Sequence, residues 1–149
     1  MLELNGLQIN VFAVLVATVA IFVLSFLWYM VLFMKPWMKE MGYDPSMRPS
    51  KKSMIKGTAL MVIGNFFFAW VLAFYFAGWR LLPGGPSEYG ALAFGLNSAL
   101  SVWIGFFVPV HLSRVVWEKH SWKLFFINSG YHLAAAGIVA LILAYGMQK

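Results

Sequence analysis

The chain has 149 residues, of which 62% are hydrophobic and only 11% are charged, and its mean hydropathy is +0.78. A soluble domain carries about 25% charged residues to cover its surface, so this composition excludes a soluble protein and indicates an integral membrane protein. The formal charge is +6, and the absence of cysteine excludes disulfides, thiolate metal sites and cysteine-based redox chemistry.

Four apolar runs follow along the chain, at residues 9–33, 54–79, 90–117 and 121–146. Each holds roughly 25 residues, and about 20 residues at a rise of 1.5 Å already span a 30 Å hydrocarbon core. They are predicted as helices, because in lipid each backbone group must be bonded within its own segment, and no run has the alternation of a barrel strand. We expect one all-α domain over residues 1–149, an integral membrane four-helix bundle with up-down-up-down topology.

The first run is predicted as a retained helix rather than a signal peptide. No Lys or Arg precedes Lys35, the apolar length exceeds that of a signal peptide, and no small-x-small cleavage pattern follows. A stripe of small residues leads down to Ser25 through Ala13, Ala17 and Ala20. Because small residues let membrane helices approach closely, this stripe is expected to face the bundle interior.

The connection at residues 34–53 is basic and contains aromatic side chains. Its first part, "MKPWMKEMG", interleaves Trp37 and methionines with lysines. This pattern predicts a short amphipathic turn in the headgroup layer, ended by Gly42. An interfacial anchor is favoured over a partner-binding helix, since tryptophan is common at membrane boundaries.

The basic residues are distributed unevenly over the connections. Nine of the eleven fall in or beside the first and third connections, namely Lys35, Lys39, Arg48, Lys51, Lys52, Lys56, Arg114, Lys119 and Lys123. By the positive-inside rule these two connections are cytoplasmic, and both termini lie outside. We therefore expect a multi-pass protein of the bacterial inner membrane. The basic loop is a topology signal and a contact for anionic lipid, and nucleic acid is not an expected partner.

The second and third runs carry further stripes of small and polar residues. On the second, the stripe comprises Asn65, Ala69, Ala73 and Ala77; on the third, it comprises Gly90, Asn97, Ser101 and Gly105. Both stripes are expected to face the interior. Pro109 has no N–H, so it leaves the carbonyl of Gly105 without its helical partner and predicts a bend.

The fourth run contains "INSGYH", which places Asn128, Tyr131 and His132 on or beside one helix face. Counted at 1.5 Å per residue from the predicted cytoplasmic ends, several polar groups share the inner half of the membrane. The resulting ligand-binding hypothesis comprises Ser25, Asn65, Gly105, Asn128, Tyr131 and His132. His111 and Glu118, seven residues apart on one face, form a hypothetical access path from the cytoplasm.

A buried polar layer has two interpretations. Hydrogen bonds between membrane helices contribute about 0.6 kcal/mol each on average, so the layer can simply fix helix register. Polar groups that converge from several helices at similar depth also form binding sites, and ionisable residues inside the membrane are functional candidates by default. For Glu118 a solvated acid, or one paired with Arg114, is the favoured interpretation.

No signature of a soluble enzyme is present. The sequence contains no phosphate-binding glycine loop, no G-x-S-x-G, and no metal-ligand spacing among His111, His120 and His132. We therefore expect no bound metal and no cofactor, and an enzymatic function is not favoured.

Three stretches resemble a known family. "FLWYMVLFMKPWM" (residues 26–38), "WIGFFVP" (103–109) and "WEKHSWKLFFINSGYH" (117–132) are similar to the small bacterial membrane family catalogued as domain of unknown function seventeen-sixty-one. The resemblance implies a four-helix bacterial membrane protein and no assigned activity. The family pattern includes Glu118, Asn128, Gly130 and Tyr131, whereas His111 and His132 are less typical of it.

Three functions remain open. The favoured one is a binding or transport bundle for a small hydrophobic or amphipathic molecule, which could form a homodimer. The second is a structural or accessory subunit of another membrane protein. The third is a membrane-embedded enzyme or a haem carrier that uses His111 and His132; against it, the two histidines are expected to differ in depth by roughly 7 Å, while axial ligands should lie at nearly the same depth.

Overall fold

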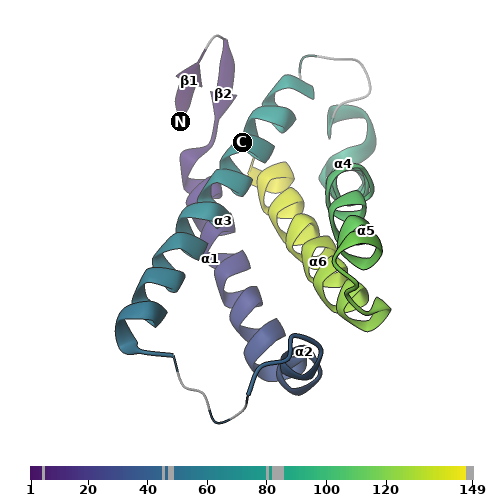
Figure 1. The fold of residues 1–149 in the computed structure, drawn as a ribbon. Helices are drawn as coiled ribbons and strands as arrows, with labels where there is room; N and C mark the ends of the chain where they lie inside the picture. The colour runs from purple at the N-terminus through teal and green to yellow at the C-terminus, as the bar shows by residue number, and fades with distance from the viewer. Residues whose placement is uncertain (5, 45, 47–48, 80, 82–85, 147–149) are drawn as a thin grey trace.

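The computed structural model describes the whole chain except residues 5, 45, 47–48, 80, 82–85 and 147–149. Arg48, one of the basic residues of the first connection, lies outside the described residues. The elements are, in chain order, β1 (Leu2–Leu4), β2 (Leu7–Ile9), α1 (Val11–Phe26), η1 (Leu27–Leu32), α2 (Met34–Glu40), α3 (Lys51–Trp79), α4 (Pro86–Val102), η2 (Trp103–Phe107), α5 (Val108–Trp117) and α6 (Trp122–Gly146). The segments η1 and η2 are π-helices that continue α1 and α4 (Figure 1).

Four helical segments are long and apolar enough to cross a membrane. They are Val11–Leu32, Lys51–Trp79, Gly90–Trp117 and Trp122–Gly146. These segments confirm the predicted all-α class and differ from the predicted spans by a few residues at most. The chain therefore has the architecture of a multi-pass membrane protein.

The first span begins later than predicted, because the strands Leu2–Leu4 and Leu7–Ile9 pair as a small antiparallel sheet before it. Ile9, which was predicted as helical, pairs with Leu2 in the two-stranded sheet and is only 1% exposed. Gly6 turns the hairpin with a φ of +80°, a conformation that glycine adopts without strain. Asn10 then caps α1, since its Oδ1 accepts from the backbone N–H of Ala13 at 3.1 Å.

Helix α6 is the central helix of the molecule. Half of its most apolar segment is buried, compared with 28% for each of the other three spans. It contacts α1, α3, α4 and α5. The approach of α4 is close, because a Cβ added to Gly95 would lie 3.3 Å from the backbone oxygen of Ala140. Small side chains on α6 thus let its neighbours approach on several sides, as is usual for membrane helices.

Helix α3 has two halves with different surroundings. All residues from 51 to 64 are exposed, and in Figure 1 this half of the helix lies away from α6. In the second half, the stripe predicted to face the interior is buried, at Asn65, Ala69, Ala73 and Ala77. The four spans therefore pack closely at the end of the hairpin, whereas α3 diverges from the others toward the end that carries α2.

The prediction that the polar stripe of the third span faces the bundle interior is wrong. Asn97, Ser101 and Gly105 are all exposed, and the Ser101 hydroxyl donates to the carbonyl of Asn97 in its own helix at 2.9 Å. The residues that face α6 instead include Ala91, Gly95 and Ala99. This stripe has the same i, i+4 spacing but consists of alanine and glycine, so it lets the helices pack closely, and Ser98 is the buried polar residue beside it.

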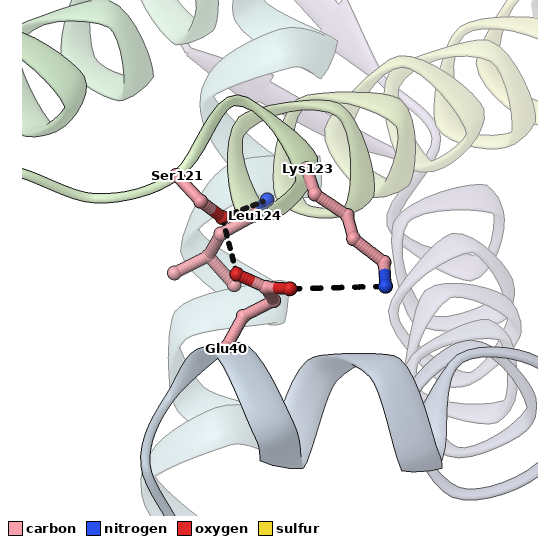
Figure 2. A network of polar contacts seen from close by, with 4 residues as sticks. All are labelled: Glu40, Ser121, Lys123 and Leu124. Carbon is pink, nitrogen blue, oxygen red and sulfur yellow. Dashed lines mark hydrogen bonds and ion pairs between the residues drawn. The ribbon is translucent and has the colours of Figure 1, made fainter.

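A short helix, α2, forms where the amphipathic turn was predicted after the first span. It ends at Glu40, and Gly42 follows with a φ of +67°. Figure 2 shows how α2 is joined to the start of α6: Ser121 Oγ donates to Glu40 Oε2 at 2.6 Å, and Lys123 Nζ lies 3.7 Å from Glu40 Oε1. Ser121 also caps α6 by accepting from the N–H of Leu124. The carboxylate of Glu40 thus lies at the positive end of the α6 dipole.

Candidate functional site

Three successive backbone carbonyls of α6, at residues 127–129, accept hydrogen bonds from side chains. The donors are Trp28 Nε1 at 3.0 Å, His132 Nδ1 at 2.8 Å and Trp103 Nε1 at 2.8 Å, in that order along the chain. Trp103 also contacts the Ser129 hydroxyl at 3.0 Å. A helical carbonyl has a second lone pair, so each bond adds to the helix rather than replacing a bond in it. The polar layer is therefore centred on this turn of α6.

Both tryptophans belong to the π-helices. Trp28 lies in η1 and Trp103 begins η2. π-helices are rare and occur mostly as short insertions in longer helices, frequently at functional sites. A π-helical segment precedes Pro109, where the bend was predicted: η2 ends at Phe107, and Pro109 lies in the first turn of α5. Gly105, in contrast, is exposed, and no atom of the described residues lies within 4 Å of an added Cβ, so the structure does not bring it into the layer.

Asn128 contributes two separate groups to the layer. Its side-chain Oδ1 accepts from the hydroxyl of Tyr29 at 3.1 Å, while its backbone oxygen accepts from His132. The ring of Tyr29 also lies against Tyr131, with centroids 5.1 Å apart. Ser25 donates to the carbonyl of Phe22 at 2.7 Å and lies beside the phenol of Tyr131. The first and fourth spans are thus joined through polar atoms at this level.

His111 and His132 are in direct contact. Nε2 of His111 lies 3.0 Å from Nδ1 of His132, and Phe107 stacks on His132 with ring centroids 4.3 Å apart. The expected difference in depth is wrong, because side chains lean toward the N-terminus of their helix. Helices α5 and α6 run in opposite directions, so the two imidazoles lean toward each other. No space for a haem plane separates them, and the residues that the structure describes contain no group of three or more metal-ligating side chains.

A cavity of about 250 Å³ lies next to this layer, between α1, α3, η2 and α6. Its polar wall consists of Asn65, Tyr131 and His132, three of the residues predicted from the sequence. The aromatic rings of Phe68 and Phe107 form much of the apolar wall. A cavity of 150 Å³ is enough to hold benzene in another protein, so this one has room for a substituted ring.

Asn65 is the polar residue of the cavity with an unsatisfied group. It is 8% exposed, and its Nδ2 is buried with no hydrogen-bond partner within the described part of the chain. A buried donor without a partner costs about 1–3 kcal/mol, and native proteins contain few of them. The amide can be satisfied by rotation toward a molecule in the cavity.

Glu118 lies apart from the layer. Its side chain is 57% exposed, and Oε2 lies 3.4 Å from Nε2 of His120. His111, in contrast, is buried within the layer itself. The structure thus agrees with a solvated acid at Glu118, and among the described residues no further polar contact joins it to His111.

The model of the family described as "Protein of unknown function (DUF1761)" matches residues 12–144. The chain belongs to this family. The match includes nearly all of the four spans and confirms the resemblance predicted from three stretches of sequence. No curated protein and no solved structure matches the chain.

Two of the stretches that resemble DUF1761 contain residues of the site that the site prediction missed. Trp28 and Tyr29 lie in the first stretch, and Trp103 and Phe107 lie in the second. The sequence feature that could have pointed to the two tryptophans is the indole N–H, which needs an acceptor when it is buried. An aromatic belt explains tryptophan near a span end equally well from sequence alone.

Proposed function

We propose that this DUF1761 protein binds a small, largely apolar molecule in the cavity between α3 and α6. The observation that carries the proposal is the buried amide of Asn65, which has no partner among the described residues and lies in the wall of a 250 Å³ cavity. A polar layer that served only to fix helix packing would gain nothing from an unsatisfied donor beside an open volume.

The exposed half of α3 offers a route into the cavity. Met61 is 46% exposed and Gly64 is exposed, yet both line the cavity. A ligand dissolved in the bilayer can therefore enter from the side, past α3. The sequence predicted a role in binding or transport, and the cavity supports binding.

The test uses thymol, an alkyl phenol, with the purified protein in lipid nanodiscs. Thymol at about ten times its dissociation constant should stabilise the protein by about 1.4 kcal/mol, because it binds only the folded state. Gly64→Phe should abolish this response, since its ring extends from the wall of the cavity. The control is Gly57→Phe, on the same helix outside the cavity, because an added Cβ at either glycine meets no atom within 4 Å.

Thymol also partitions into lipid, so the decisive quantity is the difference between the two variants. Thermal unfolding followed by far-UV circular dichroism measures it. An equal thymol response in Gly64→Phe and Gly57→Phe would overturn the proposed site and favour the structural-subunit explanation.

We further propose that residues 1–149 form a single transmembrane domain in the bacterial inner membrane, with the basic end cytoplasmic and both termini outside. The support is that α2, the loop after it, the start of α3 and residues 114–123 carry nine of the eleven basic residues. A homodimer stays a prediction.

A further inference from the structure

We propose that the ligand of this cavity is an apolar ring that carries a hydroxyl group, which donates to Nε2 of His132 and accepts from Asn65. This inference rests on the proposed function and deepens it by naming the chemical class of the ligand.

The first step assigns the proton on His132. Nδ1 lies 2.8 Å from the backbone oxygen of Asn128, which can only accept, so Nδ1 carries the hydrogen. Nε2 of His111, 3.0 Å from the same Nδ1, is then also an acceptor, and His111 carries its proton on its own Nδ1. In the neutral ring the remaining nitrogen, Nε2 of His132, has a free lone pair.

That lone pair is available to a ligand. His132 lines the cavity, and Phe107 stacks on its ring face at an interplanar angle of 27°, which leaves the ring edge for hydrogen bonding. A ligand in the cavity should therefore present a hydrogen-bond donor to Nε2 of His132. Asn65, also in the cavity wall, requires the opposite group: its buried Nδ2 has no acceptor among the described residues and would reach a ligand oxygen by rotation of the amide.

A hydroxyl group meets both requirements, since one oxygen donates one hydrogen and accepts through two lone pairs. A ketone or an ether could satisfy only Asn65, and an ammonium group could satisfy only His132. The rest of the ligand must be apolar to match the walls that Ile21 and Ala135 provide. Phe68 and Phe107, whose rings meet edge to face at 5.6 Å, form a continuous aromatic wall that favours a planar ring packed against it.

The experiment compares three probes of nearly the same shape in lipid nanodiscs. Thymol has the hydroxyl group, thymol methyl ether keeps the oxygen but cannot donate, and p-cymene has no oxygen. Dissociation constants come from the concentration dependence of the unfolding midpoint, with the Gly64→Phe response subtracted from each. We expect the methyl ether to bind about fivefold more weakly than thymol, and p-cymene more weakly again.

A variant assigns the difference to His132. His132→Phe keeps a ring that can stack on Phe107 but removes both nitrogen atoms, so it should bind thymol and its methyl ether equally. The matched control is His120→Phe, which alters a partly exposed histidine at the turn before α6 and should keep the wild-type preference. If His132→Phe does not fold, His132→Leu with the same probe pair gives the comparison, because an aliphatic side chain has no acceptor and should also abolish the preference.

The outcomes separate this inference from the proposed function. Equal binding of thymol, its methyl ether and p-cymene by the wild type, still abolished in Gly64→Phe, would overturn the hydroxyl ligand and leave the binding site in place. A thymol preference that persists in His132→Phe would overturn the role of His132. No difference between wild type and Gly64→Phe with any probe would overturn both proposals.

Discussion

At the scale of single residues, the layer contains one polar contact that can be measured in isolation. Tyr29 donates to Asn128 from a different helix, and neither atom has another side-chain partner within the part of the chain that the structure describes. Hydrogen bonds of this kind between membrane helices stabilise the folded protein by about 0.6 kcal/mol on average and by about 1.7 kcal/mol at most. The contact therefore helps to fix the position of the first span against α6, although it contributes only a small part of the free energy of unfolding.

A double-mutant cycle on Tyr29→Phe and Asn128→Leu tests this estimate. We expect a coupling energy of about 0.6–1.7 kcal/mol in the free energy of unfolding, because each single change removes the same bond. Tyr75→Phe, on an exposed face of α3, is the control for loss of a phenol and should not couple to Asn128→Leu. A coupling of zero would mean that the layer does not depend on this bond.

Asn65 should behave in the opposite way, because its amide nitrogen has no hydrogen bond to lose within the described part of the chain. Asn65→Leu should leave the melting temperature without ligand unchanged or raise it, since the change removes an unsatisfied buried donor. The same change should weaken thymol binding about fivefold. Asn97→Leu makes the same substitution at an exposed position and should affect neither quantity. Destabilisation by Asn65→Leu in the absence of ligand would show that the amide serves packing instead.

At the scale of elements, the approach of helices depends on a few glycines. Gly95 on α4 has Leu141 Cδ2 at 3.1 Å and the Ala140 oxygen at 3.3 Å from the position of an added Cβ. Backbone cannot move aside as a flexible side chain can, so a larger residue must push α4 away from α6. This close contact, together with the polar stripe that faces outward, sets the rotation of α4.

Gly95→Leu should destabilise the protein by about 1–3 kcal/mol. Gly57→Leu is the matched control, because it makes the same change on a helix where nothing lies within 4 Å of the new Cβ. Chemical denaturation of both variants in the same detergent measures the difference. Equal stability of the two would show that α4 and α6 can separate at little cost.

The elements also show how far the sequence predicts this protein. Length and hydropathy are enough for the four spans, because crossing a bilayer imposes both. The stripe through Asn65 was predicted correctly, since its other members are alanines that can only pack. The stripe through Asn97 failed because Ala91, Gly95 and Ala99 offer a second face with the same spacing, and spacing alone does not rank two faces. Trp28 and Trp103 were missed because the acceptors of their indoles lie 99 and 26 residues away in the chain.

At the scale of the whole molecule, the two ends differ in charge and in packing. The end with β1 and β2 is closely packed and includes Asn10, whose Nδ2 donates to the carbonyl of Gly146 at 3.0 Å and so joins α1 to α6. The opposite end carries α2, the start of α3 and most of the lysines, which are exposed. Exposed lysines on one end attract anionic lipid headgroups, and they resist translocation across the membrane.

This asymmetry predicts the orientation, and the absence of native cysteine allows a direct test. Gln8 belongs to β2 and Ser53 to the first turn of α3, and both are exposed. Strand β2 and the start of α3 lie at opposite ends of the molecule (Figure 1). In intact cells, Gln8→Cys should react with a membrane-impermeant maleimide, whereas Ser53→Cys should react only after the membrane is permeabilised. The cysteine-free parent chain gives the background, and a permeant maleimide shows that both cysteines can react. The reverse pattern would place the basic end outside, and labelling of both variants in intact cells would show that the charges do not select one orientation.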